Sequence, residues 1–427
     1  MRTLLFCLLA YVGLISQANA ITIDITGGTE QGGEPIAIVP FSSTKAPENI
    51  SDIVSNDLYR SGHFKLIPPE HLPAKPAESN QVNYSLWQAE GIPHIVVGSV
   101  SPNGNGYTVE FELIDVPKRK SILGLRYTAN NKNLRQVAHL ISDKIYKKLT
   151  GKRGIFSTLI IYITHKDNKY RLYIADADGA NPRRMFTSTD PVFSPSWSPN
   201  GKRIAYVAYQ DTGRNKRMAI NIQEVSTGRI TTVSAEKGLN SSPAWSPNGK
   251  RLALTLSKDG NAEIYILDLQ TRRLTRLTNN PAIDTEADWS KDGKYIAFTS
   301  DRGGKPQIYR IPVTGGKAKR LTYQGNYNTR ARFSPVDANQ LALLHNNGKG
   351  YKIAILNLKT KKLKILTKTT LDESPTFAPN GSMILYTTGS ELSAVSINGR
   401  ANQRLVEAFG KQVQEPAWSP FLEYTTK

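Results

Sequence analysis

The chain has 427 residues, which is long enough for two domains, and its formal net charge is +20. So basic a chain indicates an anionic partner, such as nucleic acid, a membrane surface or an acidic polymer. The single cysteine, Cys7, excludes a disulfide framework and a cysteine-ligated metal site.

The first 20 residues have the features of a secretory signal peptide. Arg2 precedes an apolar run over residues 4–15, and residues 18–20 (Ala-Asn-Ala) match a cleavage site before Ile21. The run is too short for a membrane span, and the cleavage site argues against the alternative of a retained N-terminal anchor. The sequence therefore predicts an exported, soluble chain cleaved after Ala20, which argues against nucleic acid as the partner.

Residues 21–150 alternate between strand and helix patterns. Residues 21–33 (ITIDITGGTEQGG) predict a short strand followed by a flexible glycine-rich segment. An α/β domain with a mixed sheet is then predicted over residues 34–150, and Gly151 is placed to end its last helix. The predicted strands are 35–41, 64–67, 95–100, 107–114 and 121–127, and the predicted helices lie near 50–58 and 134–149.

One short phrase recurs six times between residues 151 and 427. Each copy joins an aromatic residue to a turn of the Ser-Pro-Asn-Gly type and then to an alternating strand, as in PSWSPNGKRIAYV at 195–207. The aromatic anchors are Trp197, Trp245, Trp289, Phe333, Phe377 and Trp418. Their spacings, by subtraction, are 48, 44, 44, 44 and 41 residues, a period that indicates a radial array of sheets.

The two ends of this repeat region complement each other. The segment beginning at Ile155 lacks the aromatic opening of a repeat, and the copy at Pro416 has only that opening. Joining them lets the C-terminal strand complete the first blade and removes the open sheet edges. The predicted fold is thus an N-terminal α/β domain followed by a six-bladed β-propeller closed by the C-terminal strand, with the aromatic anchors in the blade cores.

Strand order places one set of loops at the mouth of the central channel. If the strands of each blade are called A to D from the axis outward, the D-to-A loops lie nearest the channel on one face. We favour a binding surface there over ordinary solvated turns, because carboxylates from four or five blades would converge on one rim. The charged or polar loop ends are Asp190, Ser242, Glu286, Arg330, Glu373 and Glu415, with Asp284, Asp288, Arg332 and Asp372 nearby.

The sequence contains no recognisable catalytic or metal-binding motif. There is no G-x-S-x-G elbow and no H-E-x-x-H, and the six histidines are scattered without metal spacing. We therefore expect no enzymatic activity and no cofactor. Two alternatives stay open for the acidic rim, which could supply a general acid and base or hold a Ca²⁺ ion in the channel.

The repeated phrases of residues 151–427 resemble the repeats of the TolB family, the periplasmic propeller proteins of the Tol–Pal cell-envelope system. The repeat also occurs in some oligopeptidase propellers, but three further segments match family phrases in order along the mature chain. These segments are ITIDIT-GG…GG-PIAIVPF at the mature N-terminus, LDESPTFAPNG at 371–381 and the closing PAWSPFL.

The resemblance implies a non-enzymatic scaffold, which we expect to be monomeric by itself. It implies that the propeller mouth binds the peptidoglycan-associated lipoprotein Pal and that the N-terminal segment contacts the inner-membrane protein TolA. Association with the outer membrane and with peptidoglycan would be indirect. The implied role is to support outer-membrane integrity and invagination during cell division.

Family positions carry over to two regions of this sequence. The TolA-contacting segment would include Ile21, Thr22, Ile23, Asp24 and Ile25. The Pal-binding set would be Leu239, Ser242, Asp284, Thr285, Glu286, Arg330, Asp372, Glu373 and Glu415. The chain departs from the family at Leu239, where a histidine is frequent, and at Ser242, which replaces a small apolar residue.

Two other classes of function are compatible with the sequence. One is a periplasmic propeller that binds carbohydrate or peptidoglycan directly, and the other is a propeller hydrolase or lyase that uses the acidic rim. The glycine-rich break also suggests a hypothesis for coupling, in which a partner at the channel shifts the N-terminal strand between docked and free states.

Overall fold

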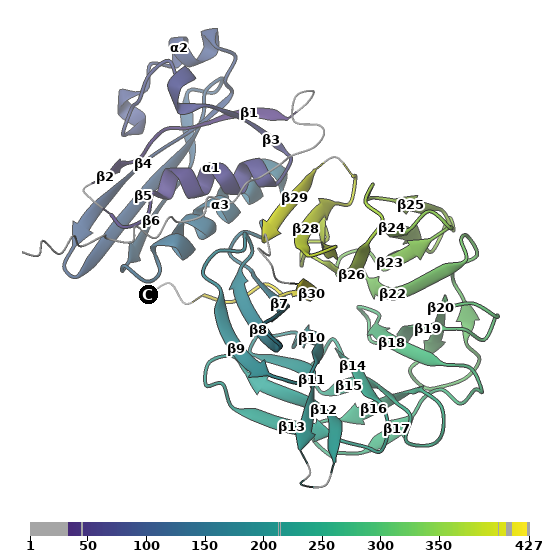
Figure 1. The fold of residues 1–427 in the computed structure, drawn as a ribbon. Coiled ribbons are helices and arrows are strands. Elements are labelled where there is room, and N and C mark those ends of the chain that lie inside the picture. The colour runs from purple at the N-terminus through teal and green to yellow at the C-terminus, as the bar shows by residue number, and fades with distance from the viewer. Residues whose placement is uncertain are drawn as a thin grey trace, which may run out of the picture.

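A computed structural model describes residues 33–43, 46–211, 213, 215–399, 401–406 and 412–424. The predicted signal peptide and residues 21–32 lie outside the described residues. Figure 1 shows an α/β domain beside a ring of small sheets, so the predicted fold class is confirmed. Within the described ranges, no helix is both long and apolar enough to span a bilayer.

The α/β domain is built on a six-stranded mixed sheet in the order β3-β1-β4-β5-β6, with the short β2 also pairing with β4. Helices α1 and α3 pack together against one face of the sheet and bury a shared apolar core. The strands are β1 (Glu34–Ile38), β2 (Ser42–Ser43), β3 (Phe64–Ile67), β4 (His94–Asn103), β5 (Gly106–Asp115) and β6 (Lys120–Ala129). The helices are α1 (Ile50–Arg60), α2 (Tyr84–Ala89) and α3 (Leu134–Thr150), and two 3₁₀ turns span Pro69–His71 and Ser79–Gln81.

Local signals explain where the long helices begin and end. The Asn49 side chain accepts a hydrogen bond from the Asp52 backbone N–H and caps α1. Gly151 ends α3 with a left-handed φ of 74°, as the sequence predicted. Sequence patterns predicted no element at α2, because only Trp87 of that short helix is buried.

The propeller consists of six four-stranded sheets, each antiparallel. Strand β30 pairs with β7 through partners such as Trp418 and Ile160, so the last strand of the chain completes the first blade. The first blade contains β30 (Gln412–Trp418), β7 (Leu159–Lys166), β8 (Lys169–Asp176) and β9 (Arg183–Ser188). The second contains β10 (Val192–Trp197), β11 (Arg203–Asp211), β12 (Lys216–Glu224) and β13 (Ile230–Ser234).

The remaining four blades follow the same order from the axis outward. The third contains β14 (Asn240–Trp245), β15 (Arg251–Leu256), β16 (Glu263–Asp268) and β17 (Leu274–Arg276). The fourth contains β18 (Asp284–Trp289), β19 (Tyr295–Ser300), β20 (Gln307–Pro312) and β21 (Lys319–Arg320). The fifth contains β22 (Tyr327–Phe333), β23 (Gln340–Asn346), β24 (Tyr351–Asn357) and β25 (Leu363–Ile365), and the sixth β26 (Asp372–Phe377), β27 (Met383–Thr388), β28 (Glu391–Ser396) and β29 (Asn402–Val406).

The recurring phrase is structural in each blade. In the second blade, Ser198 Oγ accepts from the Arg203 N–H at 2.9 Å, and Gly201 takes the positive φ of 67° that closes the turn. The tryptophan anchors are buried and join neighbouring blades, since Trp245 Nε1 donates to the Ser196 carbonyl at 3.3 Å. They therefore belong to the scaffold, as predicted.

An ionic cluster joins the two domains. His139 of α3 places Nδ1 2.7 Å from Asp57 Oδ2 of α1, and its Nε2 lies 3.8 Å from Asp178 Oδ2 in the turn after β8. Arg60 Nη2 pairs with Asp57 Oδ1 at 2.5 Å, and Arg135 pairs with Asp178. Because Asp57, His139 and Asp178 are all buried, this cluster fixes the α/β domain on the first blade.

Candidate functional site

The α/β domain contacts one face of the propeller at the first and sixth blades and leaves the other face free. Gln403 Nε2, at the start of β29 beside a turn between strands C and D, donates to the Arg60 carbonyl of α1. Arg60 Nη1 donates to the Ala177 carbonyl, beside a turn between strands C and D, at 3.4 Å. The D-to-A loops lie at the opposite ends of the strands, so the α/β domain does not cover their face (Figure 1).

A β-bulge recurs in every innermost strand, three residues before the aromatic anchor. The strand register shifts there in all six blades, and the bulged residue takes a φ between 50° and 57°. Bulges re-aim side chains, and all six bulged residues line the central channel. We call them the bulge ring: Ser194, Ser242, Glu286, Arg330, Ser374 and Glu415.

Arg330 is the hub of the bulge ring. Its Nε lies 3.2 Å from Glu286 Oε1, and its Nη1 lies 3.5 Å from Glu415 Oε1. It also donates to the Ser374 hydroxyl, while Glu415 accepts from the Ser194 backbone N–H. Five of the six ring residues, all except Ser242, are therefore connected in one polar network.

Electrostatics keep Arg330 charged. Burial lowers the pKa of the guanidinium, but Glu415, Glu286 and Glu373 outweigh that effect and raise the pKa above its ordinary value. With one arginine and two glutamates, the bulge ring carries a formal charge of −1. It presents a polar, mildly acidic centre to whatever approaches this face.

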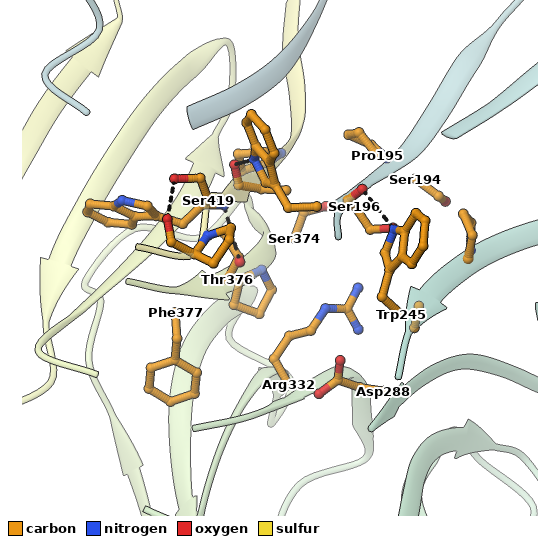
Figure 2. Close-up of a pocket in the computed structure, with 18 of the residues that line it drawn as sticks. Ser194, Pro195, Ser196, Trp245, Asp288, Arg332, Ser374, Thr376, Phe377 and Ser419 are labelled. Atoms are coloured by element: carbon orange, nitrogen blue, oxygen red, sulfur yellow. Dashed lines mark hydrogen bonds between the residues drawn. The ribbon is translucent and has the colours of Figure 1, made fainter. Parts of the chain in front are cut away.

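Below the bulge ring, the channel encloses a cavity of about 450 Å³. Figure 2 shows Asp288 and Arg332 pointing toward one another inside it. Burial raises the pKa of Asp288 to about 6, against the opposing effect of Arg332. Its Oδ2 accepts from the Phe333 backbone N–H at 2.8 Å, so this carboxyl also holds two blades together.

Two carboxylates expected at the mouth lie beneath it, which corrects that expectation. Asp284 is fully buried, and its Oδ1 and Oδ2 accept from Arg302 Nη2 at 2.8 and 2.6 Å. Asp372, at the equivalent position, is also fully buried and accepts from Thr369 Oγ1 at 2.5 Å. Both side chains hold their loops in shape, so any influence they exert on a partner passes through the loop backbone.

The other predicted mouth residues fall at different depths. Glu373 is exposed one position before the bulge, and Asp190 pairs with Lys216 Nζ at 2.8 Å outside the ring. Ser194 and Ser374, rather than Asp190 and Glu373, therefore occupy the bulge positions. The half-buried predicted residues on this face are Leu239, Ser242, Thr285, Glu286, Arg330 and Glu415.

Sequence reasoning missed the apolar tips of the mouth loops. Ile283, Tyr323 and Leu371 lie in three successive D-to-A loops and are 52, 68 and 65% exposed. The sequence did contain a signal for these residues, because a large apolar residue in a turn without periodicity has no core to fill. Together with the bulge ring, these tips give the free face a polar centre with exposed apolar side chains beside it, the kind of surface that often marks an interaction site.

The structure also bears on where an ion could sit. A Ca²⁺ ion in the channel remains a prediction, and the two ring glutamates that would hold it already contact Arg330. Elsewhere in the part of the chain that the structure describes, Asp57, His139 and Asp178 have ligand-type atoms within 4.8 Å of one another. The guanidiniums of Arg60 and Arg135 neutralise those carboxylates, which favours an ion-pair network there over a metal site.

Comparison with known proteins gives consistent results over both domains. Family models described as "TolB amino-terminal domain" and "TolB beta propeller domain" match residues 21–122 and 146–422. The Tol-Pal system protein TolB of Nitrosococcus oceani is 48% identical over 94% of this chain and 93% of its own length. That of Thioalkalivibrio sulfidiphilus is 46% identical over 98% of this chain and 97% of its own length.

A solved structure gives the same result. The crystal structure of TolB from Acinetobacter baumannii superposes with a TM-score of 0.86 at 42% identity, and the match covers 94% of this chain and 100% of that one. The architecture, the repeat and these matches lead to one conclusion: the chain belongs to the TolB family.

Proposed function

We propose that the protein is a non-enzymatic periplasmic scaffold that binds the lipoprotein Pal at the free mouth of its propeller. The observation that carries the proposal is the composition of this face, where the polar bulge ring is flanked by exposed apolar tips on three successive loops. Membership of the TolB family supports Pal as the partner, since the relatives are named as Tol-Pal system proteins.

The apolar tips give a test of the Pal-binding face. Replacing Tyr323 and Leu371 by serine should weaken Pal binding about 30-fold or more, because a single hot-spot side chain that becomes buried contributes about 2 kcal/mol. Both side chains are more than half exposed, so the free protein should unfold at an unchanged temperature. Isothermal titration calorimetry with soluble Pal measures the affinity.

Ile230→Ser is the matched control for these substitutions. Ile230 is 44% exposed and begins β13, next to a turn between strands C and D on the opposite side of the propeller. This variant should bind Pal as the unaltered protein does. Equal loss in the control, or full affinity in the double variant, would contradict the proposed face.

The second part of the proposal concerns the N-terminal segment. We propose that residues 21–33, which contain the predicted strand and glycine-rich break, contact TolA and report on the state of the propeller mouth. A chain lacking these residues should lose TolA binding in a pull-down assay while keeping its unfolding temperature and its Pal affinity. Unchanged TolA binding would refute this part and leave the Pal proposal standing.

Direct binding of peptidoglycan is the alternative function. The structure gives it less support, because the aromatic anchors that could stack on sugars are largely buried between blades. Purified sacculi free of Pal distinguish the two functions. Sedimentation of the protein with such sacculi would favour the alternative, whereas sedimentation that requires added Pal supports the scaffold.

A further inference from the structure

Most of the net positive charge of this protein comes from one stretch of the propeller. Residues 303–371 contain fourteen lysines and arginines and a single acidic residue, Asp337, which gives a formal charge of +13 within the total of +20. This stretch forms the outer half of the fourth blade and all of the fifth. The proposed Pal-binding face does not account for the excess.

Arg330 and Arg332 face the channel, and the other twelve cations lie outside it. We call these twelve side chains, from residues 305–320 and 349–368, the basic rim. Among the described residues, none of the twelve forms an ion pair, although several exposed cations elsewhere do. Examples are Lys216 with Asp190 at 2.8 Å, Arg229 with Glu224 at 2.5 Å and Lys258 with Asp259 at 2.9 Å.

The basic rim follows the outside edge of two adjacent blades. Figure 1 places β20, β24 and β25 on the outer perimeter of the ring. Lys368 lies in a D-to-A loop and Lys361 in the turn between strands C and D, so the charge spans the full height of the edge. Lys352 and Lys364 reach only backbone carbonyls, at 3.0 and 2.8 Å, which leaves their charges unneutralised.

We propose that the basic rim docks the propeller edge-on against a bilayer that carries anionic lipid headgroups. None of the rim side chains lines the channel cavity, and on a convex edge dispersed lysines match a broad charged surface better than a single polymer chain. Exposed Ile365 of β25 lies among the cations, and such a side chain can enter the interfacial layer of a membrane. Edge-on docking leaves the mouth of the channel free for a protein partner.

Vesicle sedimentation tests this proposal without any protein partner. The intact mature protein should bind vesicles containing roughly one third phosphatidylglycerol, but not vesicles of phosphatidylcholine alone. Binding should weaken as ionic strength rises from about 0.01 M to 0.15 M, because the Debye length falls from about 30 Å to 8 Å. Each lysine near an anionic surface strengthens binding roughly fivefold, so replacing Lys361, Lys362 and Lys364 by glutamine should weaken it about a hundredfold.

A control with the same change in charge isolates the rim. Lys120, Lys132 and Lys144 are exposed cations of the α/β domain, and replacing them by glutamine should leave vesicle binding nearly unchanged. Equal losses in the two triple variants would show that net charge alone is responsible and would overturn the proposal. Binding of soluble polyphosphate without binding of any vesicle would also overturn the proposal, because that result would assign the basic rim to an anionic polymer. Neither outcome affects the Pal proposal.

Discussion

A chain that ends at Val406 should fail to form a stable propeller. Strand β30 supplies the innermost strand of the first blade, and its removal leaves the inner edge of β7 unpaired and takes away a packing neighbour of β26. Trp418 is 7% exposed and donates from Nε1 to Thr158 Oγ1 at 2.8 Å, so its loss alone should cost about 3–5 kcal/mol. With the rest of the strand also gone, the cost approaches the whole stability of a typical domain, about 5–15 kcal/mol.

Circular dichroism during heating measures this effect. The shortened chain should show no cooperative transition for the propeller, and adding a peptide of residues 412–424 should restore part of it. The control is a chain lacking only residues 425–427, which should melt like the full protein. A shortened chain that unfolds at the normal temperature would show that the ring does not depend on its closing strand.

Asp178→Ala should be the most damaging single change at the junction of the domains. It leaves His139 with Asp57 alone and Arg135 with only its longer contacts to Glu48 and Asp176. Removing one partner from a buried ion pair costs about 3–5 kcal/mol. Calorimetry should show the α/β domain and propeller separating into two transitions. Asp190→Ala removes an exposed ion pair with Lys216 and should change little, so equal effects of the two substitutions would contradict this account.

The same cluster should make domain docking depend on pH. Burial lowers the pKa of His139, but Asp57 and Asp178 raise it further, and the net pKa is above its ordinary value. The stability that protonated His139 gives to domain docking is therefore fully present below about pH 6.5 and is lost as the pH rises through the raised pKa. Burial raises the pKa of Asp178, but Arg60, His139 and Arg135 lower it well below its usual range.

The contribution of Asp178 is thus present above about pH 3.9 and is lost as the pH falls below that value. Docking should be most stable between about pH 4 and 6.5. His139→Gln should remove the loss of stability at higher pH in calorimetric scans. His345→Gln should not, because burial lowers the pKa of His345 and gives it the opposite dependence. If the His139→Gln variant still loses stability at higher pH, a group other than His139 causes the pH dependence.

The blade pattern could be predicted from sequence because its causes are local. An aromatic anchor, a turn with fixed dihedral preferences and an alternating strand lie within about a dozen consecutive residues, as at 195–207. The ring closure followed from the same pattern, since an opening without a body at Pro416 matched a body without an opening at Ile155.

The depth of the mouth residues could not be predicted in this way. Asp284 and Glu286 are two positions apart, and in a regular strand their side chains would share one face. The bulge at Glu286 breaks that alternation, so Glu286 faces the channel while Asp284 is buried against Arg302. The ionic cluster gave no sequence signal at all, because Asp57, His139 and Asp178 come from three separate segments.

The position of the α/β domain has a consequence for the order of assembly. The domain contacts both sides of the closing seam, through Asp178 of the first blade and through Gln403 of the sixth. Synthesis runs from the N-terminus, so the α/β domain can fold first, while the first blade waits for its missing strand until the last residues are made. During that interval the domain can act as a template that holds the first and sixth blades in register for closure.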